Sequence, residues 1–249
     1  MATVGSRGAD ARPRTAGRKP RAAGRKPRAA KAPFRVALTF DAEHPDRPSA
    51  PGVQERLLDL LAKHDVRSTF FVQGRWAEAY PETARRIVEG GHLIGSHSHY
   101  HARMHLLSAR GLRSDIEAAQ AAVIDATGVD PRPWFRCPFG AGAGDARVQR
   151  FIREAGYRHV GWNVAGVDWP VERTGADVEA AIVDGAIHHG DGCVVLLHAW
   201  PDRTEGAIPG TVRRLRDAGA EFVRIDELSL RRLPETEVSD AIYVPPSPA

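Results

Sequence analysis

Two histidines four residues apart give the strongest chemical signal in this 249-residue sequence. His97 and His101 follow a short apolar run, and the glycines in that run disfavour a helix. Imidazole is the commonest neutral ligand for zinc, and this spacing at the end of a strand can aim two rings at one point. We therefore predict that both side chains bind a divalent metal, most simply zinc. Three further histidines in the same stretch fit structural or solvated roles better: His92, His99 and His105.

Two carboxylates follow the first predicted strand, and one of them would complete the metal site. Asp41 and Glu43 come directly after the apolar run 34–40 and share a side if the chain stays extended. A catalytic zinc usually has three protein ligands and one open position. One carboxylate can therefore bind the metal, while the other accepts a proton from an activated water molecule. His44 and Asp46 remain further candidates.

Three more polar residues lie in or directly after apolar segments. Arg136 follows Trp134 and Phe135, where a buried guanidinium needs a carboxylate partner. It would hold a catalytic carboxylate in place or form a purely structural ion pair. Asp168 and His198 each end a short predicted strand. A carboxylate bonded to one imidazole nitrogen stabilises the protonated ring, which can then donate a proton to a leaving amine.

Length and composition favour one α/β domain. Hydrophobic residues make up 42% of the chain, enough for a sizeable core. No apolar run reaches the roughly 18 residues of a membrane helix, and the N-terminus lacks the apolar core of a secretory signal. The resulting expectation is a soluble, cytoplasmic protein, unless the true start of the chain or its export route differs.

Both cysteines lie in apolar, strand-like surroundings. We expect Cys137 and Cys193 to be reduced and buried, and two cysteines cannot form a four-thiolate zinc site. A nucleophilic role for Cys137 is the less favoured alternative, because no base lies next to it in the sequence.

Strand-like and helix-like segments alternate along the folded part of the chain. The predicted strands are 34–40, 68–72, 92–96, 133–136, 158–163, a short one closed by Asp168, 192–198 and 221–225. The predicted helices are 53–64, 78–89, 108–127, 145–155, 176–188 and 204–218. Roughly seven strands, each followed by a helix, indicate a single-domain (β/α) barrel, with an open doubly wound sheet as the alternative. The glycine-rich stretch 140–144 is a poor dinucleotide fingerprint.

The two ends of the chain differ in composition from this domain, which we place at 34–230. Ten of the 35 basic residues and one of the 31 acidic residues lie in residues 1–31. The segment 1–33 contains a repeated Ala-Gly-Arg-Lys-Pro-Arg-Ala and is predicted to be a disordered basic tail. It would contact nucleic acid or another anionic polymer without sequence specificity, or only add solubility. Residues 231–249 form a Pro-rich C-terminal tail.

The ordered motifs resemble the polysaccharide deacetylase family, also called the NodB-homology domain or carbohydrate esterase family 4. The resemblance covers about residues 34–230. Its motifs stand here as His97-Ser98-His99-Tyr100-His101, Arg136-Cys137-Pro138-Phe139-Gly140, Asp168-Trp169 and Leu196-Leu197-His198. The resemblance implies a distorted (β/α)7 barrel that uses a divalent metal, usually Zn2+, to hydrolyse acetyl groups.

The resemblance also implies a role for each matching residue. Asp41 would be the general base, oriented by Arg136, and His198 the general acid, tuned by Asp168. The metal ligands would include His97 and His101. The substrate-binding residues would be Phe139, through its backbone N–H, and the pocket walls Trp169 and Leu196.

The first motif departs from the common family form T-F-D-D-G. It reads Thr39-Phe40-Asp41-Ala42-Glu43, and alanine cannot bind a metal. By analogy with family branches that carry D-x-[DE], Glu43 would become the third ligand. Two smaller departures are Ala199, where Asp is frequent, and Phe139, where Tyr is common.

These residues together predict a metal-dependent hydrolase that removes acetyl groups from an N-acetylated or O-acetylated carbohydrate. An acetylated sugar or glycan is therefore the expected partner. A related C–N hydrolase acting on a ureide or another small amide is the second hypothesis. A catalytically silent barrel that binds glycan or nucleic acid is the third, because Ala42 has replaced a usual ligand.

Overall fold

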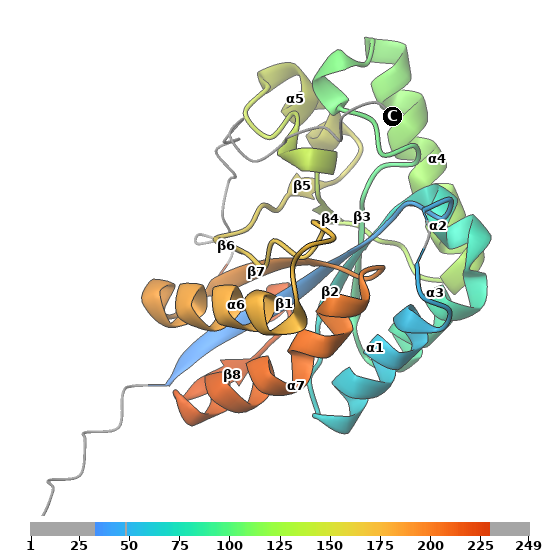
Figure 1. Ribbon diagram of the computed structural model, residues 1–249. Helices are drawn as coiled ribbons and strands as arrows, with labels where there is room; N and C mark the ends of the chain where they lie inside the picture. The colour runs from blue at the N-terminus through green and yellow to red at the C-terminus, as the bar shows by residue number, and fades with distance from the viewer. Residues whose placement is uncertain (1–32, 48, 230–249) are drawn as a thin grey trace, which may run out of the picture. The chain divides into compact units, whose positions relative to one another are not determined.

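The computed structural model describes residues 33–47 and 49–229. The predicted basic and Pro-rich tails lie outside the described residues, apart from residue 33. Figure 1 shows a curled sheet with its helices laid along one side. This arrangement confirms the predicted single α/β domain of the distorted-barrel type. No helix among the residues described has the length and apolarity to cross a membrane.

One parallel sheet forms the centre of the fold. Its strand order is β5-β4-β3-β2-β1-β7-β6, and β8 pairs with the start of β1. The strands are β1 (Phe34–Ala42), β2 (Thr69–Val72), β3 (Leu93–Ser96), β4 (Trp134–Phe135), β5 (Arg158–His159), β6 (Val164–Ala165), β7 (Cys193–His198) and β8 (Ala220–Phe222). The outermost strands β5 and β6 do not pair, so the barrel stays open between them.

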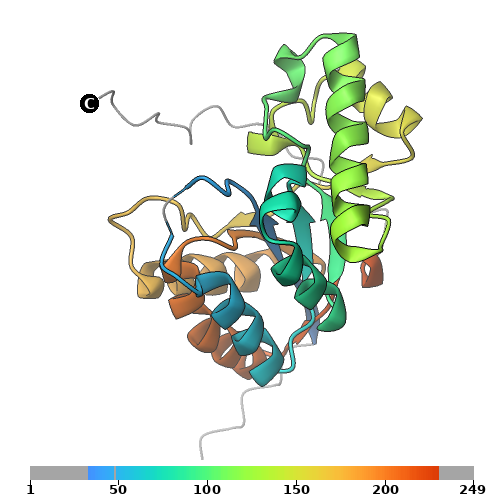
Figure 2. The ribbon, with the colours of Figure 1, turned by 90° about the vertical axis from the view of Figure 1, so that its right-hand side faces the viewer.

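The helices form a belt on one face of the sheet, in the order α6, α7, α1, α3, α4 and α5. Figure 2 shows this belt in profile. The helices are α1 (Val53–Lys63), α2 (Gly74–Ala79), α3 (Pro81–Glu89), α4 (Ala109–Thr127), α5 (Ala146–Glu154), α6 (Gly175–His189) and α7 (Asp202–Asp217). The central strands β1, β2 and β7 are buried along almost their whole length and are therefore mostly apolar.

Alternate side chains of the strands point to the helix-covered core and to the inner face that holds the site. In β1, Val36, Leu38 and Phe40 pack against the helices, and successive side chains of a strand point to opposite faces. Thr39 and Asp41 therefore lie on the inner face of the curl. This alternation directs the polar residues of β1 to the inside while its apolar residues build the helix-covered core.

Four predicted elements differ from the structure. The strand expected at 158–163 is only the two-residue β5 (Arg158–His159). The helix expected at 78–89 is two helices, because Tyr80 leaves the helical conformation (φ −128°, ψ 55°) and Pro81 begins α3. The strand expected to close at Asp168 is β6, which ends at Ala165 before the left-handed Val167 turns the chain. The last strand ends early, and Ile225–Glu227 forms a 3-10 turn.

The packing of α1 on the sheet makes a stability prediction. Leu61 is fully buried in the helix-covered core. The substitution Leu61→Ala should lower the free energy of unfolding by about 2–5 kcal/mol, because it removes buried methyl groups and leaves a cavity. Urea unfolding measures this change. Leu106→Ala is the control, since Leu106 is 72% exposed and its truncation should cost less than about 0.5 kcal/mol. Equal losses in both variants would contradict the assigned core.

Candidate metal centre

Three buried donor atoms converge beyond the ends of β1 and β3. One carboxylate oxygen of Glu43, Oε2, lies 3.2 Å from His97 Nε2 and 2.5 Å from His101 Nε2. The three side chains can present ligand atoms that all lie within 4.8 Å of one another. None of the three residues is more than 7% exposed. Two imidazole nitrogens and one carboxylate oxygen form a ligand set that suits zinc.

A hydrogen bond fixes the orientation of the His97 ring. Its Nδ1 lies 2.9 Å from the carbonyl oxygen of Arg136, which can only accept. The ring proton therefore sits on Nδ1 when the imidazole is neutral, and the Nε2 lone pair faces Glu43. Such a bond from the outer nitrogen is the usual way in which proteins orient a metal-binding histidine.

His101 reaches the same point from a tightly bent loop. Ser98 and His101 both adopt left-handed backbone conformations, with φ of 62° and 58°. Ser98 Oγ accepts a hydrogen bond from the N–H of His101 at 2.9 Å. Non-glycine residues rarely adopt this conformation, so the surrounding structure must stabilise the loop.

Asp41 forms a buried ion pair with Arg136 beside these donors. Arg136 Nη1 donates to Asp41 Oδ1 at 2.8 Å, and Nη2 donates to Thr39 Oγ1 at 2.9 Å. The guanidinium is fully buried and lies 4.0 Å from the centre of the Phe71 ring. The other Asp41 oxygen, Oδ2, lies 3.5 Å from His97 Nε2. One carboxylate oxygen is thus held by Arg136, and the other faces the donor cluster.

Asp168 and His198 form a second buried pair beside the cluster. Asp168 Oδ1 lies 2.7 Å from His198 Nδ1, and Oδ2 accepts from the His198 N–H at 2.8 Å and from Thr204 Oγ1 at 2.5 Å. Burial alone would lower the pKa of His198, but the charge and hydrogen bond of Asp168, aided by Glu43 and Asp41, raise it to about 9. His198 is therefore protonated at neutral pH, and its Nε2 lies 3.9 Å from Glu43 Oε1.

Glu43 remains ionised despite its burial. Burial by itself would raise the pKa of this carboxyl, but the charges and hydrogen bonds of His101 and His97 lower it well below its ordinary value. Asp41, Glu43 and His198 form a second group of possible ligands that shares the same carboxylate. Glu43 thus lies at the centre of the site, between the histidine pair and the Asp168–His198 pair.

Aromatic rings lie beside His101 and His198 at the edge of this centre. The Phe139 ring lies 4.5 Å from the ring of His101 and is 42% exposed. The half-buried Trp169 ring lies 5.6 Å from the ring of His198. Leu196 is buried two residues before His198 in β7 and so faces the same side of that strand. The two expected wall residues, Trp169 and Leu196, and the ring of Phe139 therefore reach the centre from different parts of the chain.

Several other candidates lie outside the donor cluster. His92 Nδ1 accepts a hydrogen bond from the N–H of Ser68 at 3.0 Å, which is a structural role. His105 is exposed, and Asp46 pairs with Arg75 at 3.2 Å. His44 lies 3.4 Å from Glu43 Oε1 but belongs to neither group of possible ligands among the described residues.

The cysteines are free and buried, as expected. Burial raises the pKa of the Cys137 thiol far above its usual range. A nucleophilic role for Cys137 therefore has no support, because the thiolate would be the reactive form.

Sequence reasoning missed three residues that border or support the site. Thr39 accepts a hydrogen bond from Arg136, and Thr204 donates one to Asp168. Trp200 lies 6.0 Å from the ring of His198, with the Arg47 guanidinium 4.2 Å above its ring. The alternation in β1 could have indicated Thr39, since it shares a face with Asp41, but no sequence signal marked the other two.

Comparisons with known proteins agree with this geometry. The sequence matches the family described as polysaccharide deacetylase over residues 28–160. The peptidoglycan-N-acetylglucosamine deacetylase PgdA of Listeria monocytogenes is 36% identical over 194 residues, which are 78% of this chain and 38% of that protein. A family 4 carbohydrate esterase from Streptomyces lividans, solved with acetate, aligns with a TM-score of 0.66 and 31% identity, over 76% of this chain and 91% of that one.

Not every similar structure is of an active enzyme. A family 4 pseudoenzyme from Bacillus anthracis aligns with a TM-score of 0.70 and 26% identity, over 79% of this chain and 65% of that one. The chain also spans well under half the length of PgdA. These comparisons establish kinship rather than a particular substrate: the chain belongs to the polysaccharide deacetylase family, the NodB-homology or carbohydrate esterase family 4 fold.

Proposed function

We propose that this protein is a metal-dependent hydrolase that removes acetyl groups from an acetylated glycan, with Zn2+ as the metal. The observation that carries the proposal is the position of the Glu43 carboxylate. Its Oε2 lies within 3.2 Å of both His97 Nε2 and His101 Nε2. Glu43 thus supplies the oxygen donor that Ala42 cannot supply.

The residues fit a divalent cation on their chemistry alone. His97 presents a nitrogen lone pair, because its other nitrogen is bonded to a carbonyl oxygen. Glu43 is ionised, and a buried carboxylate requires a positive charge beside it. When bound, a divalent cation would polarise the acetyl carbonyl and acidify a water molecule. His97, His101 and Glu43 would hold it.

Two residues of the chain are placed to move protons. Asp41 Oδ2 faces the donor cluster, while Arg136 holds the other carboxylate oxygen, so Asp41 can accept a proton from the attacking water as general base. His198 is protonated through its bond to Asp168 and can deliver a proton to the leaving nitrogen or oxygen as general acid. Asp41, Glu43 and His198 can present ligand atoms that lie within 4.8 Å of one another. Asp41 can therefore act on the water while His198 acts on the leaving group.

The surroundings favour a carbohydrate. Phe139, Trp169 and Leu196 present apolar surface around the centre, against which an acetyl methyl group and the faces of a sugar ring can pack. PgdA of Listeria monocytogenes is named for its action on peptidoglycan N-acetylglucosamine, so an N-acetylated glycan is the first substrate class to test.

A C–N hydrolase of small amides is the second candidate function. The same acid, base and metal ligands could serve it, and acetate release separates the two activities. The third hypothesis, a silent binding barrel, has a precedent in the Bacillus anthracis pseudoenzyme. The complete set of proton-transfer groups here favours catalysis.

Removal of the Glu43 carboxylate should weaken metal binding. Glu43→Ala deletes the only proposed oxygen ligand, so zinc content measured by mass spectrometry should fall from about one per chain to well below half. Glu82→Ala is the matched control, because Glu82 is an exposed carboxylate outside the donor cluster. Full zinc occupancy in Glu43→Ala would remove Glu43 from the ligand set.

Neutralising Asp41 should separate catalysis from metal binding. Asp41→Asn keeps an oxygen that can accept from Arg136 but removes the base, so acetate release should fall by at least about 100-fold. Zinc content should stay near that of the wild type, because His97, His101 and Glu43 remain. Acetate release within about threefold of the wild type would rule out Asp41 as the base.

The Asp168–His198 pair predicts the basic limb of the pH profile. A general acid must be protonated, so activity should fall as the pH rises through the pKa of His198, which Asp168 raises. Asp168→Asn removes the negative charge that stabilises the imidazolium. The basic limb of the kcat profile should therefore move to lower pH, by about one unit or more. An unmoved basic limb with merely reduced activity would assign that limb to another group.

A further inference from the structure

The loop that carries both metal-binding histidines is held by a carboxylate outside all five motifs. Asp115, in α4, accepts hydrogen bonds from the backbone N–H groups of His99 and Tyr100, each at 3.0 Å. Its carboxylate is only 4% exposed and has no ion-pair partner among the described residues. A buried carboxylate without a cationic partner depends on such N–H donors. Asp115 thus binds the backbone of two of the three residues that lie between His97 and His101.

The other side of the same loop is held by the first turn of α2. The N–H groups of Gly74 and Arg75 donate to the carbonyl oxygens of Ser98 and His99, at 2.9 and 3.3 Å. The first N–H groups of a helix have no partner within the helix, so the loop provides acceptors for them. The three residues between His97 and His101 therefore bridge α2 and α4 through their backbone groups.

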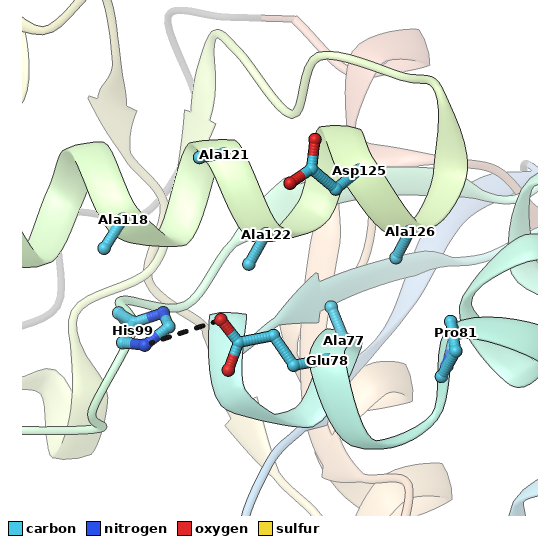
Figure 3. Close-up of a pocket in the computed structure, with 9 residues that line it drawn as sticks. All are labelled: Ala77, Glu78, Pro81, His99, Ala118, Ala121, Ala122, Asp125 and Ala126. Carbon is cyan, nitrogen blue, oxygen red and sulfur yellow. Dashed lines mark ion pairs between the residues drawn. The ribbon is translucent and has the colours of Figure 1, made fainter.

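Gly74 allows this close approach. A Cβ atom at Gly74 would lie 2.3 Å from His99 Nδ1 and 3.0 Å from the Cα of Ala119 in α4. Figure 3 shows His99 between the two helices, where α4 presents a row of small side chains and His99 faces Glu78 of α2. The loop therefore packs closely against the backbone of Gly74, while His99 also lines a pocket between α2 and α4.

The two metal-binding histidines differ in how their rings are oriented. The Nδ1 of His97 is fixed by the carbonyl oxygen of Arg136. The Nδ1 of His101 is buried and has no hydrogen-bond partner among the described residues. Besides its contacts with Glu43 and Phe139, the direction of the His101 ring depends on its left-handed backbone conformation, which the rest of the loop must stabilise.

We propose that Asp115 and Gly74 are positioning residues that clamp the 97–101 loop and thereby set the affinity for the metal. The inference rests on the proposed metal-dependent function and extends it to two residues that touch neither metal nor substrate. Their action is exerted through the backbone of His99 and Tyr100, so it should appear in metal affinity before it appears in the chemistry at saturating metal.

The test compares Asp115→Asn with Asp125→Asn. An asparagine amide can accept only one of the two N–H bonds, and its NH2 group would oppose the other N–H. Asp125 is an exposed carboxylate of the same helix and makes no contact with the loop backbone. The dissociation constant for Zn2+, measured by competition with a chromophoric chelator, should rise about 10-fold or more in Asp115→Asn. It should stay within twofold of the wild type in Asp125→Asn, and excess Zn2+ should restore most of the kcat of Asp115→Asn.

A second variant tests the clamp from the opposite side. Gly74→Ala introduces a Cβ against His99 and should also weaken Zn2+ binding, with an altered visible spectrum of the Co2+-substituted protein. Thermal unfolding of the metal-free variants separates positioning from stability, because the affinity loss must occur in chains that are folded at the assay temperature. Failure of both variants to fold would overturn the proposal, since the residues would then be structural.

The remaining outcomes are distinct. Unchanged Zn2+ affinity in folded Asp115→Asn would overturn the clamp and leave the proposed function intact. A loss of kcat that excess Zn2+ does not restore, at unchanged affinity, would overturn it as well. A wild-type chain that binds no Zn2+ would overturn the proposed function and the clamp together, and this result is read from the wild type alone.

Discussion

The buried guanidinium of Arg136 is the interaction on which the arrangement of the site depends. It reaches from the end of β4 to Asp41 and Thr39 of β1, and it also donates to the carbonyl oxygens of Val160 and Gly161. The backbone carbonyl of the same residue fixes the ring of His97. Removing one partner of a buried ion pair costs about 3–5 kcal/mol, because the other charge is left uncompensated in a dry interior. One residue thus connects the proposed base, a proposed ligand and the inner faces of several strands.

Charge balance around Glu43 explains why so many titratable groups can share one buried space. Two carboxylates, Asp41 and Glu43, lie beside three imidazoles and a guanidinium, and no residue of the cluster is well exposed. Burial acts against every charge, so each carboxylate is stable only beside a positive group. In the metal-free protein this need is met by Arg136 and by His97 and His198, whose pKa values the nearby carboxylates raise. A divalent cation would supply more positive charge at the same point, and His97 would then bind it as a neutral ligand.

The sequence predicted the site residues that stand out from their neighbours along the chain. Parallel strands with two covered faces have apolar runs, and polar residues at their ends stand out, which is how Asp41, Arg136 and His198 were found. Residues that act through the backbone carry no such signal. Asp115 lies in the middle of an amphipathic helix. In the sequence it cannot be told from the other polar residues of that helix, because its partner loop is distant along the chain. The short α2 was missed because a six-residue helix that begins with glycine has weak intrinsic preference, and its stability comes from the loop it contacts.

The departure at Ala42 moves the carboxylate by one position along the chain, to Glu43. Ala42 is fully buried and packs with the residues of β1 that face the helices. The chain remains in β1 through Ala42, where its carbonyl accepts from the N–H of Gln73, and the next side chain faces inward again. Glu43 therefore shares a side with Asp41, and its additional methylene group lets the carboxylate reach back to the histidines. An apolar residue at position 42 suits the core, and the oxygen donor is retained one residue later. A pseudoenzyme would have no need to keep a buried, ionised carboxylate at this point, since such a group destabilises the fold unless a positive partner is present.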